Sequence, residues 1–150
     1  MFHYASSADQ QLLAEWRWLI GALPQLIGWS SGGDLFIHTG DGKIAMIDPG
    51  AGNVTVVADT LAAFRAQLED ADRSAELLQL ALVRAFETSR NRLQPGCCLG
   101  FKQLPALGGS YDLENRFPLS ITEHAAFTGD VHRQIRDLPD GAKVKFKIVP

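Results

Sequence analysis

Residues 34–57 read DLFIHTGDGKIAMIDPGAGNVTVV, and this stretch decides the fold. Three short apolar runs (34–38, 43–47 and 53–57) are separated by the turn sequences GDG and DPGAG. Glycine tolerates positive φ and proline presets φ, so both sequences suit the tight turns of hairpins. We predict three antiparallel strands in a β-meander, which needs helices to cover its apolar face.

A helix is predicted on the N-terminal side of the meander. Apolar residues recur at helical spacing between Ser7 and Leu23. Ser7 with Gln10 makes a plausible capping box, and Pro24 is expected to end or kink the helix.

Two helices are predicted directly after the meander. Thr60 caps the first, whose apolar stripe contains Phe64. Asp72 caps the second, which continues to about Arg90.

The last third returns to strand and loop over residues 96–111. A helix then runs from Thr122 to about Leu138, and the sequence Pro-Asp-Gly ends it. Residues 143–149 alternate lysine with apolar side chains, which predicts a half-buried strand.

Composition places the chain among small globular domains. It has 150 residues, of which 46% are hydrophobic and 21% charged, and we find no repeat or linker. A chain of this size buries about 70% of its unfolded surface. We therefore predict an α+β fold, an antiparallel meander sheet packed against several helices, in a single domain over residues 1–150.

Charge and hydropathy exclude several classes of partner. The formal charge is -3 and no basic block is present, so nucleic-acid binding is not expected. The N-terminus lacks a signal-peptide pattern, and no apolar run is long enough to span a membrane. We expect a cytoplasmic protein without membrane contact, and the sequence leaves its oligomeric state open.

The residues that could carry chemistry favour a structural role. Cys97 and Cys98 are adjacent, which disfavours a disulfide between them, and they enter an apolar strand where a thiol is buried rather than reactive. His124 and His132 are eight residues apart, and neither cysteine belongs to a CxxC pair, so no zinc motif is present. We expect no cofactor and no metal.

Several segments together resemble a known family. They read DGKIAMIDPGAG, TLAAFRAQL and then LGF…PALGG…EN…EH, and they fall within about residues 28–138. This order resembles the C-terminal domain of type VI secretion immunity proteins, a domain of unknown function. That domain is similar in general plan to the SMI1/KNR4-like immunity proteins.

The resemblance implies a non-catalytic protein that binds and neutralises a cognate secreted toxin, with a nuclease as a candidate toxin. The acidic balance of the chain suits steering toward a basic partner. Residues of the shared motif are expected to serve the fold: Gly100, Phe101, Pro105, Gly108, Gly109 and Asn115. Candidate partner-binding residues are two aromatic anchors and four carboxylates: Trp29, Tyr111, Asp112, Glu114, Glu123 and Asp130.

Two other functions stay open at this point. The first is a small-ligand-binding or regulatory module that uses the sheet as one wall of a pocket. The second is an enzyme in which Cys97 or Cys98 meets a histidine brought close by folding.

Overall fold

The computed structural model describes residues 1–89 and 92–145. Seven strands occur in the described residues: β1 (Phe2–Tyr4), β2 (Gln25–Ser30), β3 (Leu35–His38), β4 (Ile44–Asp48), β5 (Asn53–Ala58), β6 (Cys97–Phe101) and β7 (Arg116–Ser120). The α-helices are α1 (Arg17–Ile20), α2 (Leu61–Glu69), α3 (Ala71–Leu77), α4 (Leu80–Ser89) and α5 (Ile121–Ile135). Three 3₁₀ helices are η1 (Ser7–Trp16), η2 (Pro105–Leu107) and η3 (Leu113–Asn115).

Strands β1 to β5 form one antiparallel sheet in chain order, so the predicted α+β fold with a meander sheet is confirmed. The three predicted strands correspond to β3, β4 and β5. Their turns use positive φ at Gly42 and Gly52, where an L side chain would be strained. Strands β1 and β2 were not predicted. They extend the meander from three strands to five.

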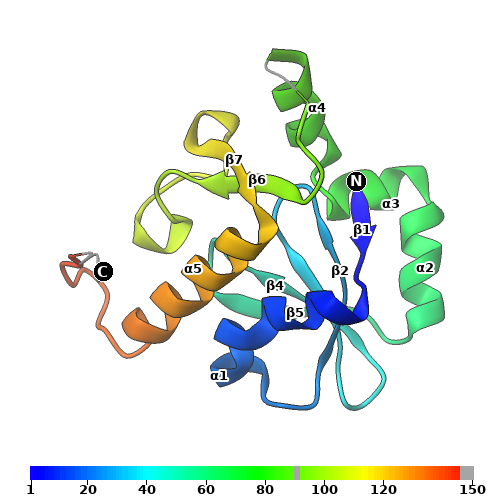
Figure 1. Ribbon diagram of the computed structural model, residues 1–150, viewed down its shortest axis with the longest axis horizontal. Coiled ribbons are helices and arrows are strands. Elements are labelled where there is room, and N and C mark those ends of the chain that lie inside the picture. Colours follow the sequence, from blue (N-terminus) through cyan, green and yellow to red (C-terminus); the bar gives the residue numbers. More distant parts are fainter. Residues whose placement is uncertain (90–91, 146–150) are drawn as a thin grey trace.

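Around β3 and β4 the sheet is covered on both faces, whereas most of the edge strand β5 is exposed (Figure 1). On one face, Leu35, Ile37 and Ile47 pack with residues of η1 and α5. On the other, Phe36 and Ile44 pack with residues around α2. This alternation along β3 is what a strand buried on both faces requires.

The first predicted helix is shorter and tighter than expected. It begins as the 3₁₀ helix η1, and α1 ends at Ile20 rather than at Leu23. The capping pair is Ser6 with Asp9, because the Asp9 carboxylate accepts from the Ser6 N–H at 2.8 Å. Gln10, expected in the cap, instead bonds both the N–H and the C=O of Leu26 at 2.8 and 2.9 Å.

The predicted cap at Thr60 is confirmed, since its hydroxyl accepts from the Ala63 N–H at 3.0 Å. The predicted cap at Asp72 is wrong. Asp70 accepts from the Arg73 N–H at 2.9 Å and begins α3. The predicted second helix is also divided in two, because Gln79 adopts φ 52° between α3 and α4.

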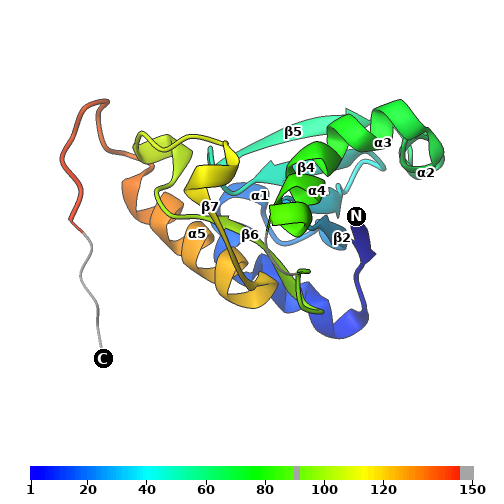
Figure 2. The same ribbon diagram turned by 90° about the horizontal axis from the view of Figure 1, so that it is seen from above.

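Strands β6 and β7 form a separate two-stranded sheet, and α5 follows directly (Figure 2). Helix α5 lies against η1, where a Cβ on Gly129 would come 2.7 Å from the Glu15 carbonyl oxygen. The indole N–H of Trp16 donates to the Ala125 carbonyl at 3.0 Å. Of the strand predicted over 143–149, residues 143–145 form no strand, and the remainder lies outside the described residues.

Candidate functional site

The loop between β6 and β7 is held in one shape by Asn115. The Asn115 side chain accepts from the Gln103 N–H at 3.0 Å and donates to the Gln103 carbonyl at 2.8 Å. It also donates to the Ser110 carbonyl at 2.6 Å. A Cβ on Gly109 would come 1.9 Å from the Gln103 carbonyl oxygen, so only glycine fits this crossing.

Arg116 links this loop to the turn between β2 and β3 of the main sheet. Its side chain is 4% exposed, and it donates to four backbone carbonyls: Gly32 at 2.5 Å, Leu99 at 2.9 Å, and Gly100 and Tyr111 at 3.3 Å each. The guanidinium carbon also lies 4.1 Å from the centroid of the Phe101 ring. Among the described residues no carboxylate lies within salt-bridge distance of it. Carbonyl dipoles in contact with the guanidinium, together with the charges of Asp34 and Asp48 further away, therefore compensate this buried charge.

The DPGAG turn meets the same loop from the other side. One carboxylate oxygen of Asp48 accepts from the Gly50 N–H at 2.8 Å, and the other accepts from the Tyr111 hydroxyl at 2.8 Å. The Ala106 N–H donates to the Gly50 carbonyl at 3.0 Å. The DPGAG and PALGG motifs, which are far apart in sequence, are thus parts of one cluster.

Tyr111 presents an aromatic surface to solvent at the edge of this cluster. Its side chain is 43% exposed, and its ring stands edge-on to Phe101 with the centroids 5.5 Å apart. Partial burial, followed by the hydrogen bond to Asp48, raises the pKa of the phenol, which keeps it a neutral donor. Asp112 and Glu114 follow on the same loop and are exposed.

The other candidate binding residues lie elsewhere. The expectation of an aromatic anchor at Trp29 is wrong, because this side chain is 6% exposed and stacks on His3. Glu123 is exposed in the first turn of α5, and Asp130, further along α5, pairs with Arg133. No contact between these two carboxylates and Tyr111 occurs among the described residues.

The motif glycines and proline pack the loop onto its neighbours. A Cβ on Gly100 would come 2.4 Å from Leu119, and one on Gly50 would come 3.0 Å from Pro105. Gly108 has φ 99° and its N–H donates to the Pro105 carbonyl at 3.0 Å. These positions shape the loop, whose exposed side chains include Tyr111, Asp112 and Glu114 as well as Lys102 and Gln103.

Two titratable side chains, Asp34 and His124, are buried next to the cluster, and the sequence did not predict their burial. Asp34, at the start of the first predicted strand, is 6% exposed and accepts from the Gln79 side-chain amide at 2.9 Å. Burial, with a further contribution from Asp48, raises its pKa to about 7. His124 is 2% exposed, and burial followed by the charge of Arg116 lowers its pKa to about 4. Its Nε2 has no hydrogen-bond partner among the described residues.

Cys98 is not poised as a nucleophile, and Cys97 beside it is half-buried. Cys98 is fully buried, and burial raises the pKa of its thiol, which disfavours the thiolate needed of a nucleophile. Within residues 1–89 and 92–145, no three His, Cys, Asp or Glu side chains gather closely enough to hold a metal ion. In the same residues, no helix has the length and apolar character required to cross a bilayer.

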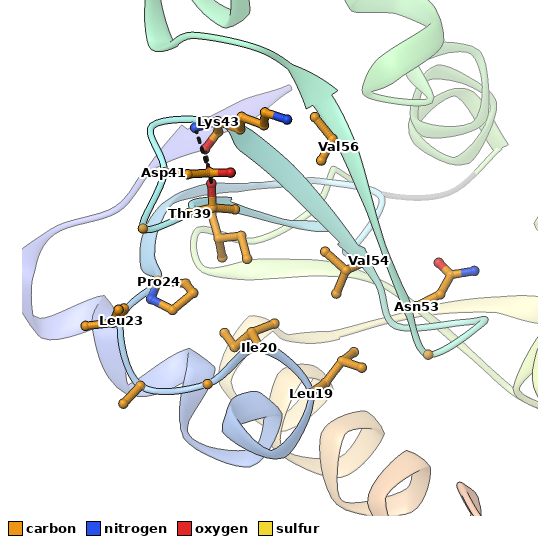
Figure 3. Close-up of a pocket in the computed structure, with 15 residues that line it drawn as sticks. Leu19, Ile20, Leu23, Pro24, Thr39, Asp41, Lys43, Asn53, Val54 and Val56 are labelled. Carbon is orange, nitrogen blue, oxygen red and sulfur yellow. Dashed lines mark hydrogen bonds between the residues drawn. The ribbon is translucent and has the colours of Figure 1, made fainter.

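A separate apolar groove of about 720 Å³ lies at the edge of the sheet (Figure 3). Leu19 and Ile20 lie on one side, and Val54 and Val56 of the edge strand β5 lie on the other. At one end, Asp41 accepts hydrogen bonds from the Thr39 hydroxyl and the Lys43 N–H.

Comparison with known proteins assigns the chain to a family. A crystal structure of Atu4351 from Agrobacterium tumefaciens is similar, with a TM-score of 0.59 and 17% sequence identity. The match covers 86% of this chain and 66% of that one, so the chain spans just under two thirds of that protein, and the likeness concerns the fold. No curated protein matches. The family model described as "T6SS immunity protein Tdi1, C-terminal" matches residues 58–132, half of the chain, which therefore belongs to this family of type VI secretion immunity proteins.

Proposed function

We propose that this protein binds a cognate toxin of a type VI secretion system and neutralises it without catalysis of its own, in the cytoplasm of the cell that makes it. Membership of the immunity family is the observation that carries this proposal. The buried thiol of Cys98 supports a binding role rather than an enzymatic one.

The surface that we propose for toxin binding is the Tyr111 loop, defined as Tyr111, Asp112 and Glu114. Tyrosine is enriched among residues that dominate interface energies, because it adds a large contact area at low entropic cost. Two exposed carboxylates beside it would steer a basic partner and pair with it at the rim. A nuclease is the toxin class we propose, since nucleic-acid-binding surfaces are basic.

The test begins with a candidate toxin of the type VI secretion system of the same organism, which is purified and titrated against this protein. Reversing both charges with Asp112→Lys and Glu114→Lys is expected to weaken binding by about 30-fold, the effect of one interface hot spot of about 2 kcal/mol. A matched control reverses Asp59 and Glu76, two exposed carboxylates outside the Tyr111 loop. Both double variants change the net charge by +4, so only a local effect separates them.

Three outcomes decide the matter. Loss of affinity in the loop variant but not in the control supports the proposed surface. Equal losses in both variants would indicate general electrostatic attraction and reject the surface. A wild-type protein that does not bind the toxin, or does not inhibit it, would reject the function.

The apolar groove favours a second candidate function, the binding of a small apolar ligand. Its volume of about 720 Å³ lies within the ordinary range for ligand sites. A ligand bound there would copurify and be seen by native mass spectrometry, and Val56→Lys would remove it. Protein purified without any bound small molecule, and unchanged by extracts of its host cell, would reject this function.

A further inference from the structure

We propose that Asp48 is a positioning residue for toxin binding: its hydrogen bond to the Tyr111 hydroxyl fixes the orientation in which the Tyr111 ring meets the partner. This inference rests on the function proposed above. It assigns a role in recognition to a residue outside the Tyr111 loop, 63 positions earlier in the chain.

The two carboxylate oxygens of Asp48 have different tasks. Oδ1 accepts from the N–H groups of Gly50 and Ala51 at 2.8 and 3.3 Å and thereby closes the DPGAG turn. Oδ2 accepts from the Tyr111 hydroxyl at 2.8 Å. One side chain therefore both shapes its own turn and restrains a distant aromatic residue.

The turn is a firm anchor because it is fixed at two further points. The Ala106 N–H donates to the Gly50 carbonyl at 3.0 Å, which ties the turn to the loop between β6 and β7. A ring nitrogen of His132, on α5, lies 2.7 Å from the Pro49 carbonyl oxygen, and His132 is 4% exposed. A Cβ on Gly52 would come 2.4 Å from that ring, so the turn packs directly on it.

Tyr111 is restrained at three places along its length. Arg116 holds its backbone carbonyl at 3.3 Å, the Phe101 ring stands edge-on to its ring, and Asp48 holds its hydroxyl. With 43% of the side chain exposed, these restraints leave one aromatic surface facing solvent in a defined orientation. An aromatic ring that is ordered before binding loses less conformational freedom when the partner arrives.

Four variants test the role of Asp48. Asp48→Asn keeps a carbonyl oxygen for the turn and places an amide beside the Tyr111 oxygen, so a hydrogen bond remains. Asp48→Ser keeps one oxygen near the turn but is too short to reach Tyr111. Tyr111→Phe removes the hydroxyl and leaves the turn untouched, and the fourth variant combines Asp48→Ser with Tyr111→Phe.

We expect Asp48→Ser and Tyr111→Phe each to lower the association rate constant with the toxin about tenfold. A pre-organised state that is populated less often reduces productive encounters in proportion. The dissociation rate constant stays unchanged, since the contacts in the complex are the same. Asp48→Asn binds like wild type, and the combined variant is no weaker than either single change, because both remove one hydrogen bond.

Other results would overturn the proposal. If Asp48→Asn is as weak as Asp48→Ser, the lost charge is responsible and the hydrogen bond is not. If Tyr111→Phe raises the dissociation rate constant, or the effects of the two single changes add, the hydroxyl contacts the toxin directly. If Tyr111→Ala weakens binding while Asp48→Ser does not, the positioning role fails but the surface stands. If Tyr111→Ala itself binds like wild type, the proposed surface fails, and the positioning role fails with it.

Discussion

Asp34→Asn should stabilise the protein at alkaline pH and have little effect at acid pH. The folded structure raises the pKa of this carboxyl from 3.8 to about 7, chiefly through burial. A carboxyl whose pKa is raised on folding favours the folded state only while it is protonated. Its contribution to stability is therefore lost as pH rises from about 4 to about 7, and the full penalty is present above that range.

The gain in stability expected for Asp34→Asn follows from the shift in the pKa of Asp34. A rise from 3.8 to about 7 corresponds to about 4 kcal/mol at about 1.4 kcal/mol per pKa unit. The asparagine side chain of the variant carries no charge to bury, and the Gln79 amide can turn to donate or accept as needed. The variant should gain up to about 4 kcal/mol over wild type at pH 8, and this gain should vanish near pH 4.

Because His124 also titrates in this pH range, the effect of Asp34 must be measured as the difference between the wild type and Asp34→Asn. Its pKa is lowered from 6.5 to about 4, so its contribution is complete above about pH 6.5 and is lost as pH falls toward 4. Asp34 and His124 thus change the stability of the wild type in opposite directions over much of the same range. Only the difference between wild type and Asp34→Asn isolates the carboxyl.

Urea unfolding between pH 4 and 8, followed by the fluorescence of the three tryptophans, measures this difference. We expect the two free-energy curves to diverge as pH rises and to run parallel above about pH 8. A free-energy difference that is constant across the whole range would refute the reasoning, because it would mean that Asp34 has the same proton affinity in both states.

Two further predictions concern packing and thiol chemistry. Gly109→Ala should lower the free energy of unfolding by about 1–3 kcal/mol in thermal or urea melts, because the new methyl group would collide with the Gln103 carbonyl. The control is Gly40→Ala, whose new methyl group would have its nearest neighbour 3.5 Å away, and equal stability of the two variants would contradict this account. In the folded protein iodoacetamide should modify the half-buried Cys97 faster than the buried Cys98, whereas both cysteines should react in urea. Labelling of Cys98 at the rate of Cys97 under native conditions would show that the burial of Cys98 is not maintained.

The elements that the sequence predicts well are those decided by neighbouring residues. Strands β3 to β5 follow from alternation and from glycine-rich turns, and the Thr60 cap follows from one hydroxyl before an apolar stripe. Strand β2 was missed because four of its six residues are buried, so that no clear alternation of polar and apolar side chains marks it, and because Gly28 interrupts it. A Cβ on Gly28 would come 2.4 Å from the Phe2 ring, so that glycine serves the pairing with β1.

Elements set by distant residues escaped prediction. Neither glycine nor proline marks the break between α3 and α4; there Gln79 takes positive φ while its side chain holds Asp34, 45 residues away. Asp48 is recognisable as a turn residue from the sequence, yet its second oxygen meets Tyr111 only after folding. The burial of Trp29 depends in the same way on β1, whose His3 stacks on it.

The junction between η1 and α5 has a consequence for how the protein is made. Trp16 and Trp18 donate their indole N–H groups to Ala125 and Gly129, 109 and 111 residues later in the chain. Contacts between residues so far apart in sequence form late in folding, and during synthesis they cannot form until α5 has left the ribosome. Until then one face of the sheet lacks the part of its cover that Ile121 and Ala125 of α5 supply, and a chain released early would be a substrate for chaperones and proteases. If the protein neutralises a toxin as proposed, only chains finished through α5 can do so.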